Sequence, residues 1–377
     1  MSKSFFRRFT KKFFIITNFI LAALFLIGCY GYWLDPRYFW PIGFLTLSVF
    51  YFLLLLLIFL IFWFFIKPRW ALISGIAILL AYKPVTNIIP LRFTSSFDKV
   101  KHTNSLRVMS WNVAQFDIMQ NKKHPEVKEQ MINLINEYQP DIACFQEMVC
   151  EDSPVAKPHG PLSEYLQRLE FPEHFYSYNR KEDFWDYAHF GIIIFSKYPI
   201  INRQTLMWYP NDYNSIFQYA DIVKGTDTVR VFNIHLQSLH FSRDNLKYID
   251  DPSVQDKDAI KESKSIIGKF KTGFLKREVQ ADRIRAEIDK SPYPVIVCGD
   301  LNDVPNSYAY HTIGKGLKNA FAEKGSGLGR TFSGIAPTLR IDNIFVDRRF
   351  SVEQFDRVKK KLSDHFPIIT DVQLNKN

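Results

Sequence analysis

Short polar runs that could take part in catalysis follow directly after strand-like apolar segments of this sequence. Each run supplies an acid, an amide or an imidazole: Trp111-Asn112, Gln146-Glu147, Asn233-Ile234-His235, Gly299–Asn302 and Ser363-Asp364-His365. A further acid, Asp342, lies inside an apolar run. Burying such groups is unfavourable unless they are paired or bind a metal. Together they predict one shared polar site at an edge of the sheets.

Each of these residues has a structural alternative when it is taken singly. A lone Asn or Asp after a strand is usually a turn residue. Asp342 could pair with Arg340, because alternation along a strand points both side chains to the same face. His235 could be a hydrogen-bonded structural histidine, and His189 is more typical of a structural or surface histidine than of a cleft residue. The complete set, in this order, favours the shared site.

The segments between these runs predict alternating strands and helices. Strands are expected at Leu106–Trp111, Ile142–Gln146, Gly191–Ser196, Ile216–Val223, Val229–His235, Val295–Cys298 and Ile341–Val346. Helices are expected at Glu126–Tyr138 and Arg277–Asp289, the second with an apolar face. This alternation indicates a layered α/β domain whose sheets are covered by helices.

In this order the motifs resemble the signature of the endonuclease/exonuclease/phosphatase superfamily, in particular its deoxyribonuclease-like and sphingomyelinase-like members. The resemblance rests on Trp111-Asn112, Gln146-Glu147, Gly299–Asn302, Ile341–Phe345 and Ser363–Pro367, with support from Gly191–Ile200. It extends from about Leu106 to Val372. The resemblance implies an α/β four-layer sandwich, in which two packed mixed β-sheets are flanked by helices. It also implies a metal-dependent hydrolase of phosphoester bonds.

The resemblance further implies a role for each matching residue. Glu147 would be the principal metal ligand, with Asn112 and Asp364 near the metal. Mg²⁺ or Mn²⁺ is the expected cofactor, because hard cations suit oxygen ligands and phosphate substrates. His235 resembles a histidine that lies near the leaving group in deoxyribonuclease-like and sphingomyelinase-like members.

The remaining four residues would act on the attacking water and the phosphate. Asp300 would position or deprotonate the water, and Asn302 would bond the phosphate. Their i, i+2 spacing places both side chains on one side of the chain if it stays extended. His365 would contact the phosphate or act as the base, with Asp342 orienting its ring. Whether Asp300 or His365 is the base is left open by the sequence.

The first part of the chain predicts a membrane anchor. Phe13–Trp33 and Gly43–Ile66 are each long and apolar enough to cross a bilayer, which takes roughly 20 residues. Trp70–Tyr82 is shorter, and Lys83-Pro84 interrupts it. We therefore expect residues 1–93 to form two or three transmembrane helices, residues 94–105 a linker and residues 106–377 the catalytic domain.

The basic residues near these spans predict an integral, multi-pass orientation. Arg7, Arg8, Lys11 and Lys12 precede the first span, whereas Arg37 alone lies in the first loop. This asymmetry favours a cytoplasmic N-terminus. Three spans would place the catalytic domain outside the cytoplasm and two would keep it inside. We favour three, because the third segment is too apolar to place readily elsewhere.

The formal charge of +10 is confined to the anchor and its flanks. Residues 1–101 contain 12 Lys and Arg against 2 Asp and Glu, so the remaining residues carry 36 of each kind. A face for binding nucleic acid would need a basic excess in the catalytic domain. The basic stretch 257–277 is the best support for such a face, but contact with anionic lipid explains it equally well, and a solvated surface loop or helix face is a further alternative.

Three functions remain open from the sequence. The favoured one is a phosphodiesterase or phosphatase acting on lipid headgroups or other phosphoesters near the membrane. A membrane-tethered nuclease is the alternative, and a catalytically inactive binding or sensor domain is the third. The four cysteines are too few for a disulfide framework and are expected to be buried, with a Cys144–Cys150 bridge as the alternative.

Overall fold

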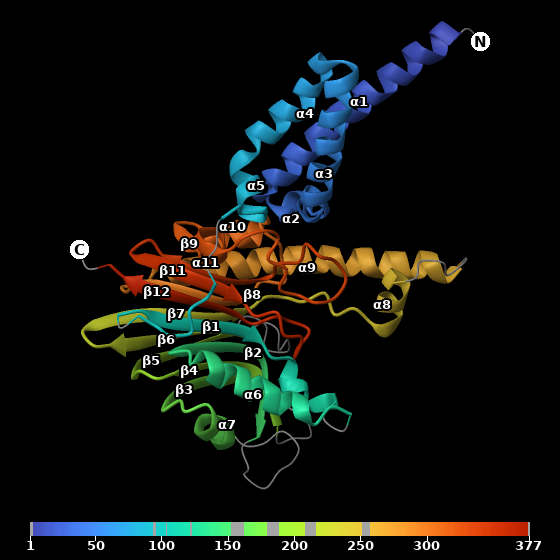
Figure 1. Cartoon of the computed structure of the whole chain (residues 1–377). Coiled ribbons are helices and arrows are strands. Elements are labelled where there is room, and N and C mark those ends of the chain that lie inside the picture. Colours follow the sequence, from blue (N-terminus) through green and yellow to red (C-terminus); the bar gives the residue numbers. More distant parts are fainter. Residues whose placement is uncertain are drawn as a thin grey trace.

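A computed structural model describes residues 3–92, 96–102, 104–120, 123–151, 162–178, 188–207, 216–250 and 257–375. Two six-stranded sheets pack face to face, helices cover their outer faces, and the N-terminal helices project from one end (Figure 1). The predicted α/β four-layer sandwich is therefore confirmed.

Both sheets are mixed, and each has one parallel pair near its centre. The first sheet has the order β11 (Phe350–Arg357), β12 (Ile368–Leu374), β1 (Leu106–Asn112), β2 (Ile142–Glu151), β4 (Ala188–Ser196) and β3 (Glu173–Tyr178). The second has the order β5 (Ile200–Met207), β6 (Ile216–Lys224), β7 (Asp227–His235), β8 (Val295–Asp300), β10 (Asp342–Asp347) and β9 (Leu317–Asn319). β1 runs parallel to β2, and β7 runs parallel to β8. The carboxyl ends of each pair therefore meet at one edge.

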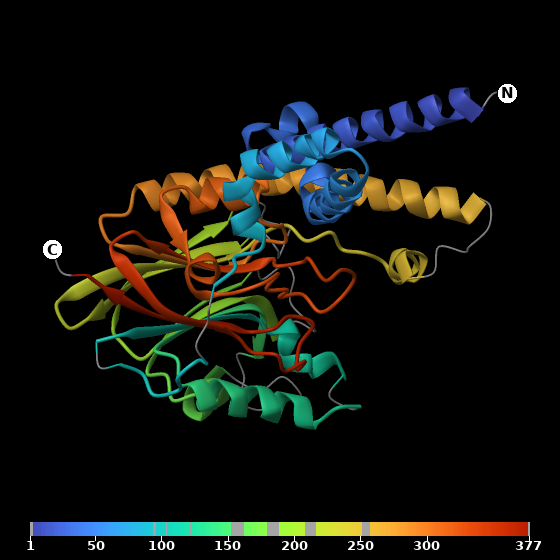
Figure 2. The same ribbon diagram turned by 45° about the horizontal axis from the view of Figure 1, so that its top comes forward.

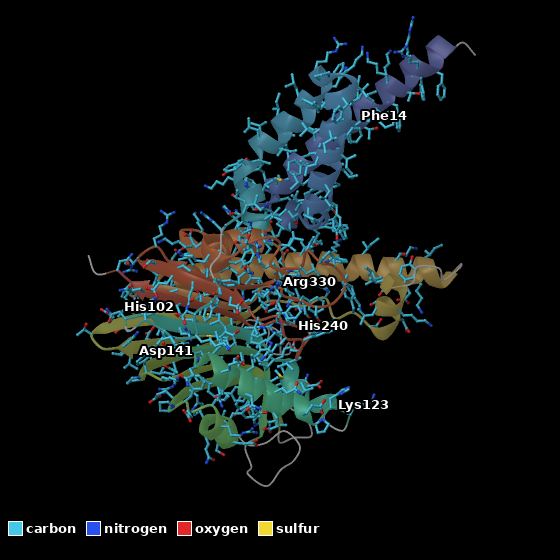
Figure 3. The ribbon with its side chains drawn as sticks, viewed as in Figure 1. Phe14, His102, Lys123, Asp141, His240 and Arg330 are labelled. Atoms are coloured by element: carbon cyan, nitrogen blue, oxygen red, sulfur yellow. The ribbon has the colours of Figure 1, made fainter. Side chains whose placement is uncertain are left out.

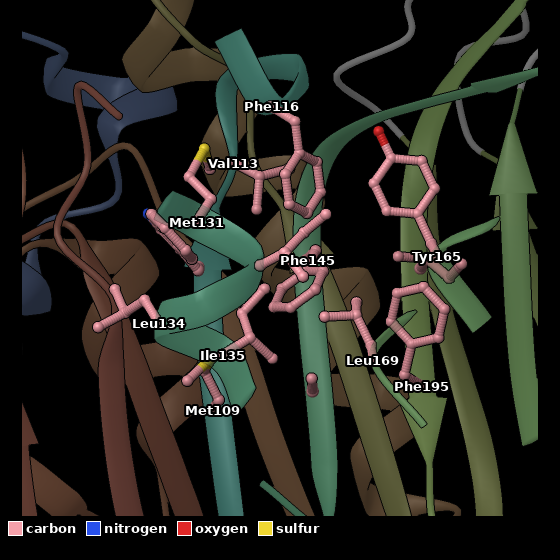
Figure 4. Close-up of a cluster of buried hydrophobic side chains, with 14 of the residues drawn as sticks. Met109, Val113, Phe116, Met131, Leu134, Ile135, Phe145, Tyr165, Leu169 and Phe195 are labelled. Atoms are coloured by element: carbon pink, nitrogen blue, oxygen red, sulfur yellow. The ribbon is translucent and has the colours of Figure 1, made fainter. Parts of the chain in front are cut away.

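Three apolar layers hold the sandwich together. Met109 and Phe145 of the first sheet pack against Met131 and Ile135 of α6 (Glu126–Tyr138) on the outside (Figure 4). Apolar side chains of the two inner faces form the middle layer: Val108, Cys144, Val231 and Cys298. The outer face of the second sheet packs on α9 (Lys257–Asp289) and α10 (Tyr308–Gly314). The remaining helical elements of this part are η2 (Ala114–Gln120), α7 (Leu162–Arg168), α8 (Arg243–Asp250) and α11 (Ala320–Lys324).

β7 and β8 approach each other closely at Gly299. Its φ is +152°, and a Cβ added there would lie 1.9 Å from the carbonyl oxygen of Ile234. We expect Gly299→Ala to destabilise the fold by roughly 3 kcal/mol or more, because backbone cannot yield as a flexible side chain does. Denaturant unfolding of the full chain in detergent measures this change.

Gly268 supplies the matched control for that substitution. It lies exposed in α9, and no heavy atom comes within 4 Å of an added Cβ. Gly268→Ala should leave stability unchanged or raise it by about 0.5–1 kcal/mol, because alanine is the better helix former. Equal unfolding midpoints for the two variants would contradict the close approach at Gly299.

The N-terminal part is a bundle of helices. Its elements are α1 (Lys3–Cys29), η1 (Gly31–Trp33), α2 (Pro36–Phe39), α3 (Ile42–Ile66), α4 (Pro68–Leu80) and α5 (Tyr82–Ile88). α1 and α3 are long and apolar enough to cross a membrane. α4 and α5 are bent by 66° at the break between them, so they form a third crossing only if the bent pair is one span.

The loop between α1 and α3 contacts the helices that cover the second sheet. The ring of Tyr32 stacks on His311 of α10, with centroids 3.9 Å apart. Arg37 forms ion pairs with Glu278 and Asp282 of α9, the second at 3.4 Å. Charged and stacked contacts therefore join this loop to the rest of the protein.

The start of α3 and the end of α5 make further contacts. Phe44 packs against Phe270 and Phe274 of α9, with ring centroids 5.1 and 5.6 Å away. The buried guanidinium of Arg340 donates hydrogen bonds to the carbonyls of Asn87 and Ile88, the second at 3.1 Å. The predicted alternative in which Arg340 pairs with Asp342 is therefore wrong.

The basic stretch 257–277 and the predicted helix Arg277–Asp289 form one continuous helix, α9. It lies along the base of the N-terminal helices and extends beyond them (Figures 1 and 2). Ile266, Phe270 and Phe274 follow each other at four-residue spacing, so the apolar face continues N-terminally and packs against Phe44. The predicted start at Arg277 was wrong because it overlooked this continuation.

All four cysteines are buried and free. Cys144 and Cys150 lie six residues apart along the same strand, β2. A strand rises about 3.3 Å per residue, so their Cα atoms are far beyond the roughly 7 Å that a disulfide permits. A Cys144–Cys150 bridge is therefore not formed.

Candidate active site

The strand register brings polar residues from both sheets to one edge. Asn112 at the end of β1 is paired with Gln146 of β2. In the second sheet, His235 and Asp342 are both paired with Asp300, from β7 and β10 respectively. Because the two sheets face each other, these strand ends surround one space.

Glu147 reaches this space through an irregularity in β2. Its φ is +53°, and the pairing of β2 with β4 shifts between Phe145 and Met148. The strand then continues to Glu151, so the predicted strand end at Gln146 was wrong. A β-bulge redirects a side chain that regular alternation would place elsewhere, at a cost of about 1–3 kcal/mol for the positive φ.

The amide of Asn112 joins two of the carboxylates. Its Nδ2 donates to Oε1 of Glu147 at 3.1 Å and to Oδ2 of Asp300 at 3.3 Å. The neighbouring indole of Trp111 donates to the carbonyl of His365 at 2.9 Å, and Ser363 donates to the carbonyl of Asn112 at 2.9 Å. The end of β1 thus holds the 363–365 loop against the carboxylates.

His365 and Asp342 form a close pair within this cluster. Nδ1 of His365 lies 2.8 Å from Oδ2 of Asp342, and its Nε2 lies 3.7 Å from Oδ2 of Asp300. Thr331 accepts hydrogen bonds from the backbone N–H groups of Ile341 and Asp342 at 3.0 Å each, which fixes this end of β10. The imidazole is therefore held with Nε2 toward the other carboxylates.

His235 lies on the opposite side of Asp300. Its Nε2 is 3.6 Å from Oδ2 of Asp300 and 3.8 Å from Oε1 of Glu147. The side chain is almost completely buried. Two imidazoles thus lie near one carboxylate oxygen, Oδ2 of Asp300, an arrangement suited to proton transfer.

The chain turns directly after Asp300, so the extended geometry considered for Asp300 and Asn302 is wrong. Asn302 has a φ of +49°, and its N–H donates to Oδ1 of Asp300 at 2.7 Å. Its side-chain amide donates to the carbonyl of Leu236 at 3.0 Å. Asn302 still lines the same cavity as Asp300 and His365.

The charges of the cluster fit a divalent cation. Burial, and next the carboxylate of Asp364, raise the pKa of Glu147 to about 7. Burial and Asp342 raise the pKa of Asp300. Carboxylates crowded in this way bind a hard cation readily, because it relieves their mutual repulsion.

We expect the oxygen ligands of such a cation to come from residues that are not already bonded to an imidazole. Glu147, Asn112 and Asp364 would supply them, and Mg²⁺ and Mn²⁺ prefer oxygen ligands. Asp300, Asp342 and His365 also have potential ligand atoms within 4.8 Å of one another. We favour the first set, since Asp342 and His365 already bond each other.

The pKa of His365 reflects its carboxylate neighbours. Burial alone would lower it, but Asp342 and then Asp300 raise it, to about 10. Asp364 contributes in the same direction, and it is exposed beside the cluster. His365 therefore carries a proton at neutral pH unless a bound cation offsets the carboxylates.

Two residues near the site were not predicted from the sequence. Arg277 and Asp303 are buried, lie 3.2 Å apart and line the same cavity as Asn302. The position of Asp303 directly after Asn302 was the sequence feature that could have identified it as a residue of the site. His189, in contrast, lies within β4 with its ring stacked on Tyr178 at 4.1 Å, as a structural histidine does.

A cavity of about 580 Å³ opens from the cluster, and we call it the groove. Glu147, Asp300 and His365 line one end, whereas Leu47 and Tyr51 of α3 line the other. The site is therefore connected to α3 of the N-terminal bundle.

Comparison with known proteins identifies the catalytic part. The sequence model described as the endonuclease/exonuclease/phosphatase family matches residues 109–365. The chain belongs to this family. Members of this family are usually metal-dependent hydrolases of phosphoester bonds, and they include phosphatases, phosphodiesterases and nucleases. A second model, a domain of unknown function (DUF8431), matches residues 11–88, and no curated protein matches the chain with significance.

Solved structures of the family share the fold at low identity. A Bacteroides thetaiotaomicron endonuclease/exonuclease/phosphatase family protein is 16% identical, covers 72% of this chain and 98% of its own, and has a TM-score of 0.51. A Bacteroides vulgatus family protein is 19% identical, with coverages of 72% and 99% and a TM-score of 0.50. The B. thetaiotaomicron mannosyl-6-phosphatase Bt3783 is 17% identical, with coverages of 71% and 99% and a TM-score of 0.49.

Proposed function

We propose that this family member is a membrane-anchored, divalent-metal-dependent hydrolase of phosphoester bonds. The observation that carries the proposal is the buried cluster in which Asn112 bridges Glu147 and Asp300 while two imidazoles flank Asp300. Amide and imidazole nitrogens beside a carboxylate pair suit an anionic substrate that reacts with water. Residues 1–93 would anchor the enzyme, 94–105 would link the parts and 106–377 would carry out catalysis.

Each side chain has a part in this proposal. Glu147, Asn112 and Asp364 would hold Mg²⁺ or Mn²⁺, which when bound supplies positive charge to the phosphate and lowers the pKa of water. Asp300 would orient or deprotonate the attacking water.

The remaining groups would act on the phosphate and its leaving group. His365, oriented by Asp342, would donate from Nε2 to the phosphate or serve as the base. His235 would serve the leaving group, and Asn302 would bond the phosphate.

The tests use the full chain in detergent with Mg²⁺ or Mn²⁺. The substrates are phosphatidic acid, sphingomyelin, phosphoinositides, supercoiled and single-stranded DNA, RNA and a generic phosphodiester. We expect hydrolysis of at least one phosphoester, its loss with EDTA and its recovery when Mg²⁺ or Mn²⁺ is added back. Absence of metal-dependent hydrolysis across the panel would overturn the proposal.

The position of α9 supports a substrate at the membrane over a polynucleotide. The ammonium of Lys271 lies 5.7 Å from the ring centroid of Trp40, and Phe270 contacts Phe44. The basic stretch of α9 thus lies against the anchor, where it can meet anionic headgroups. A basic stretch that served a nuclease would place unpaired cations in the cleft, whereas Arg277 is its one Lys or Arg side chain among the described residues that line the groove, and it is paired with Asp303 at 3.2 Å.

Contacts between the anchor and the catalytic domain support three membrane crossings. Arg37 in the first loop contacts α9, and Asn87 at the end of α5 contacts Arg340. The first loop and the chain after α5 therefore lie on the same side of the bundle. If α3 crosses the membrane, that arrangement favours a return of α4 and α5 across it. With a cytoplasmic N-terminus, the catalytic domain would then lie outside the cytoplasm.

Reporter fusions test this topology. We expect a reporter placed after Ile66 to report the cytoplasm and one placed after Asn377 to report the opposite side, because the bent α4–α5 pair crosses between them. Fusion after Trp40 is the matched control and should agree with the fusion after Asn377. If the reporters after Ile66 and after Asn377 both indicate the cytoplasm, the arrangement with three crossings is contradicted.

A further inference from the structure

The groove changes in character along its length. Its inner end is lined by Glu147, Asp300 and His365, and its outer end by Leu47 and Tyr51 of α3. Ligand pockets commonly enclose about 300–1,000 Å³, and the groove, at about 580 Å³, is of that size. A ligand that fills it needs a phosphate at one end and an apolar body at the other.

Most of the side chains that line the groove between these ends are apolar. One wall comes from the 238–241 loop and from α8 and α9, and includes Leu239, Phe241, Leu246, Ile266 and Phe270. The facing wall is the 332–341 loop, with Ile335, Ala336 and Leu339. Hydrocarbon is the chemistry that such walls bind best, because it removes their apolar surface from water.

One side chain bonds several carbonyls in the wall formed by the 332–341 loop. The guanidinium of Arg330 donates to the carbonyls of Phe332 at 2.7 Å and Gly334 at 3.1 Å, and also bonds Ser333. Arg330 and His240, which lines the opposite wall, are both labelled in Figure 3. The groove is therefore bounded by anchored backbone on this side.

The groove is continuous with the lipid-facing side of α3. Leu47 and Tyr51 are followed by Leu54, Leu55 and Ile58, a spacing that keeps all five on one helix face. Tyr51, Leu54, Leu55 and Ile58 are each at least 42% exposed. An apolar stripe thus leads from the bilayer side of α3 directly into the groove.

Charge in the groove argues against a polynucleotide. Among the described residues that line it, Arg277 is the one Lys or Arg side chain, and it is paired with Asp303 at 3.2 Å. A nucleic-acid channel instead presents several unpaired cations along the path of the phosphate backbone.

We propose that the groove holds an acyl chain of a membrane phospholipid whose phosphate lies at the Glu147–Asp300–His365 end. The inference rests on the proposed function, and it names the substrate class of the same site. The lipid enters sideways along the exposed face of α3, so that its phosphate reaches the carboxylate cluster while its chain stays in an apolar environment.

Photolabelling of the full chain tests this placement without requiring turnover. The probe is phosphatidic acid with a diazirine in one acyl chain, carried in phosphatidylcholine vesicles that contain the reconstituted protein. We expect adducts at Tyr51, Leu239 and Ile335. Long-chain phosphatidic acid should displace them, whereas glycerol 3-phosphate, which has the same phosphate but no chains, should not.

A variant that fills the groove provides the second measurement. Ser48 lines the groove, and Ser48→Phe should lower adduct formation at Ile335 by roughly tenfold, because the added ring occupies the path of the chain. Ile58→Phe is the matched control, since Ile58 is 62% exposed on the same face but beyond the groove. It should leave the labelling of Ile335 unchanged.

The outcomes separate this inference from the proposed function. Labelling confined to the exposed face of α3, or unaffected by long-chain competitor, overturns the groove as a chain site, even if soluble phosphoesters are hydrolysed. Displaceable labelling at Ile335 in a protein that hydrolyses no phosphoester retains the lipid site and overturns the proposed function. Preferential hydrolysis of DNA or RNA, with no displaceable labelling, supports the nuclease instead.

Discussion

Glu147→Gln is expected to lower kcat for metal-dependent phosphoester hydrolysis by roughly a thousandfold. Glutamine keeps the size of the side chain and can still accept the hydrogen bond from Asn112, which spans 3.1 Å. It removes the charge that would hold the cation. Steady-state kinetics of the full chain measures kcat, and titration with Mn²⁺ should show at least a tenfold weaker affinity, in line with the roughly 10–100-fold losses typical of disturbed metal sites.

The stability of the same variant separates lost chemistry from lost folding. Burial and Asp364 raise the pKa of Glu147 to about 7, which is above its value in an unfolded chain. A carboxyl group of this kind stabilises the fold while it is protonated, and that contribution is lost as pH rises through about 7. At pH 8 without metal, Glu147→Gln should therefore unfold no more easily than the unmodified protein.

Glu126→Gln is the control for that experiment. Glu126 lies exposed in the first turn of α6, so its kcat and Mn²⁺ affinity should both stay within about twofold of the unmodified protein. Equal kcat values for Glu147→Gln and Glu126→Gln, on every substrate that is hydrolysed, would contradict the assignment of Glu147 as a metal ligand.

Asp342→Asn should lower kcat by roughly a hundredfold or more. The carboxylate lies 2.8 Å from Nδ1 of His365 and fixes which ring nitrogen faces the cluster. An amide there can present either a donor or an acceptor, so the ring loses its preferred tautomer and orientation. Steady-state kinetics should show the change mainly in kcat, because Asp342 would act through His365 and not on the substrate.

The pH profile of this variant addresses the choice of base. Burial lowers the pKa of His365, and Asp342 is the largest contributor among the three carboxylates, Asp342, Asp300 and Asp364, that raise it again, to about 10. Removing the carboxylate of Asp342 lowers the pKa of His365. If protonated His365 takes part, the alkaline limb of the pH profile should move to lower pH. An unmoved limb with a reduced kcat would assign proton transfer to Asp300.

Asp347→Asn tests whether the effect is specific to the pair. Asp347 ends the same strand, β10, and its carboxylate bonds Arg349 at 2.8 and 2.9 Å. This variant should retain the kcat and the pH profile of the unmodified protein. A similar loss of kcat in both variants would mean that β10 is disturbed and that the His365–Asp342 pair has no special role.

The central strands could be predicted because they are buried, and buried strands have sequences made of continuous apolar runs. Val229–His235 and Val295–Cys298 are examples, and both lie inside the observed β7 and β8. The edge strands β5 and β11 were not predicted. Their side chains are largely exposed or only partly buried, so the apolar periodicity of their sequences is weak. Their pairing depends on neighbours that lie far away in the sequence.

The site was predictable as a set of residue types but not as a geometry. All eight proposed residues lie at or beside the one edge where β1, β2, β7, β8 and β10 meet. The bulge at Glu147 arises from pairing with β4, and the turn at Asn302 from its hydrogen bond to Asp300. The bulge has no local sequence pattern, whereas a turn is a usual alternative for an Asp that follows a strand. The extended geometry considered for Asp300 and Asn302 therefore misplaced the second side chain.

The groove could not be predicted, because its walls come from three distant segments. α3 contributes Leu47 and Tyr51, whereas the facing loop contributes Ile335. Only the docking of the anchor on α9 brings them together. In the sequence, Leu47 belongs to a uniform apolar run, and nothing distinguishes its groove-facing position from its neighbours.

The contact between α3 and α9 also governs what happens when the catalytic part is cut from its anchor. Gly43 lies so close to Phe274 that an added Cβ would be 2.4 Å from the ring, and Phe44 covers Phe270 as well. A soluble fragment that begins after residue 93 would leave both rings in water, where such patches drive self-association. It would also lack one wall of the groove. Inactivity or aggregation of such a fragment would therefore reflect the loss of the N-terminal helices. Activity must be measured on the intact chain.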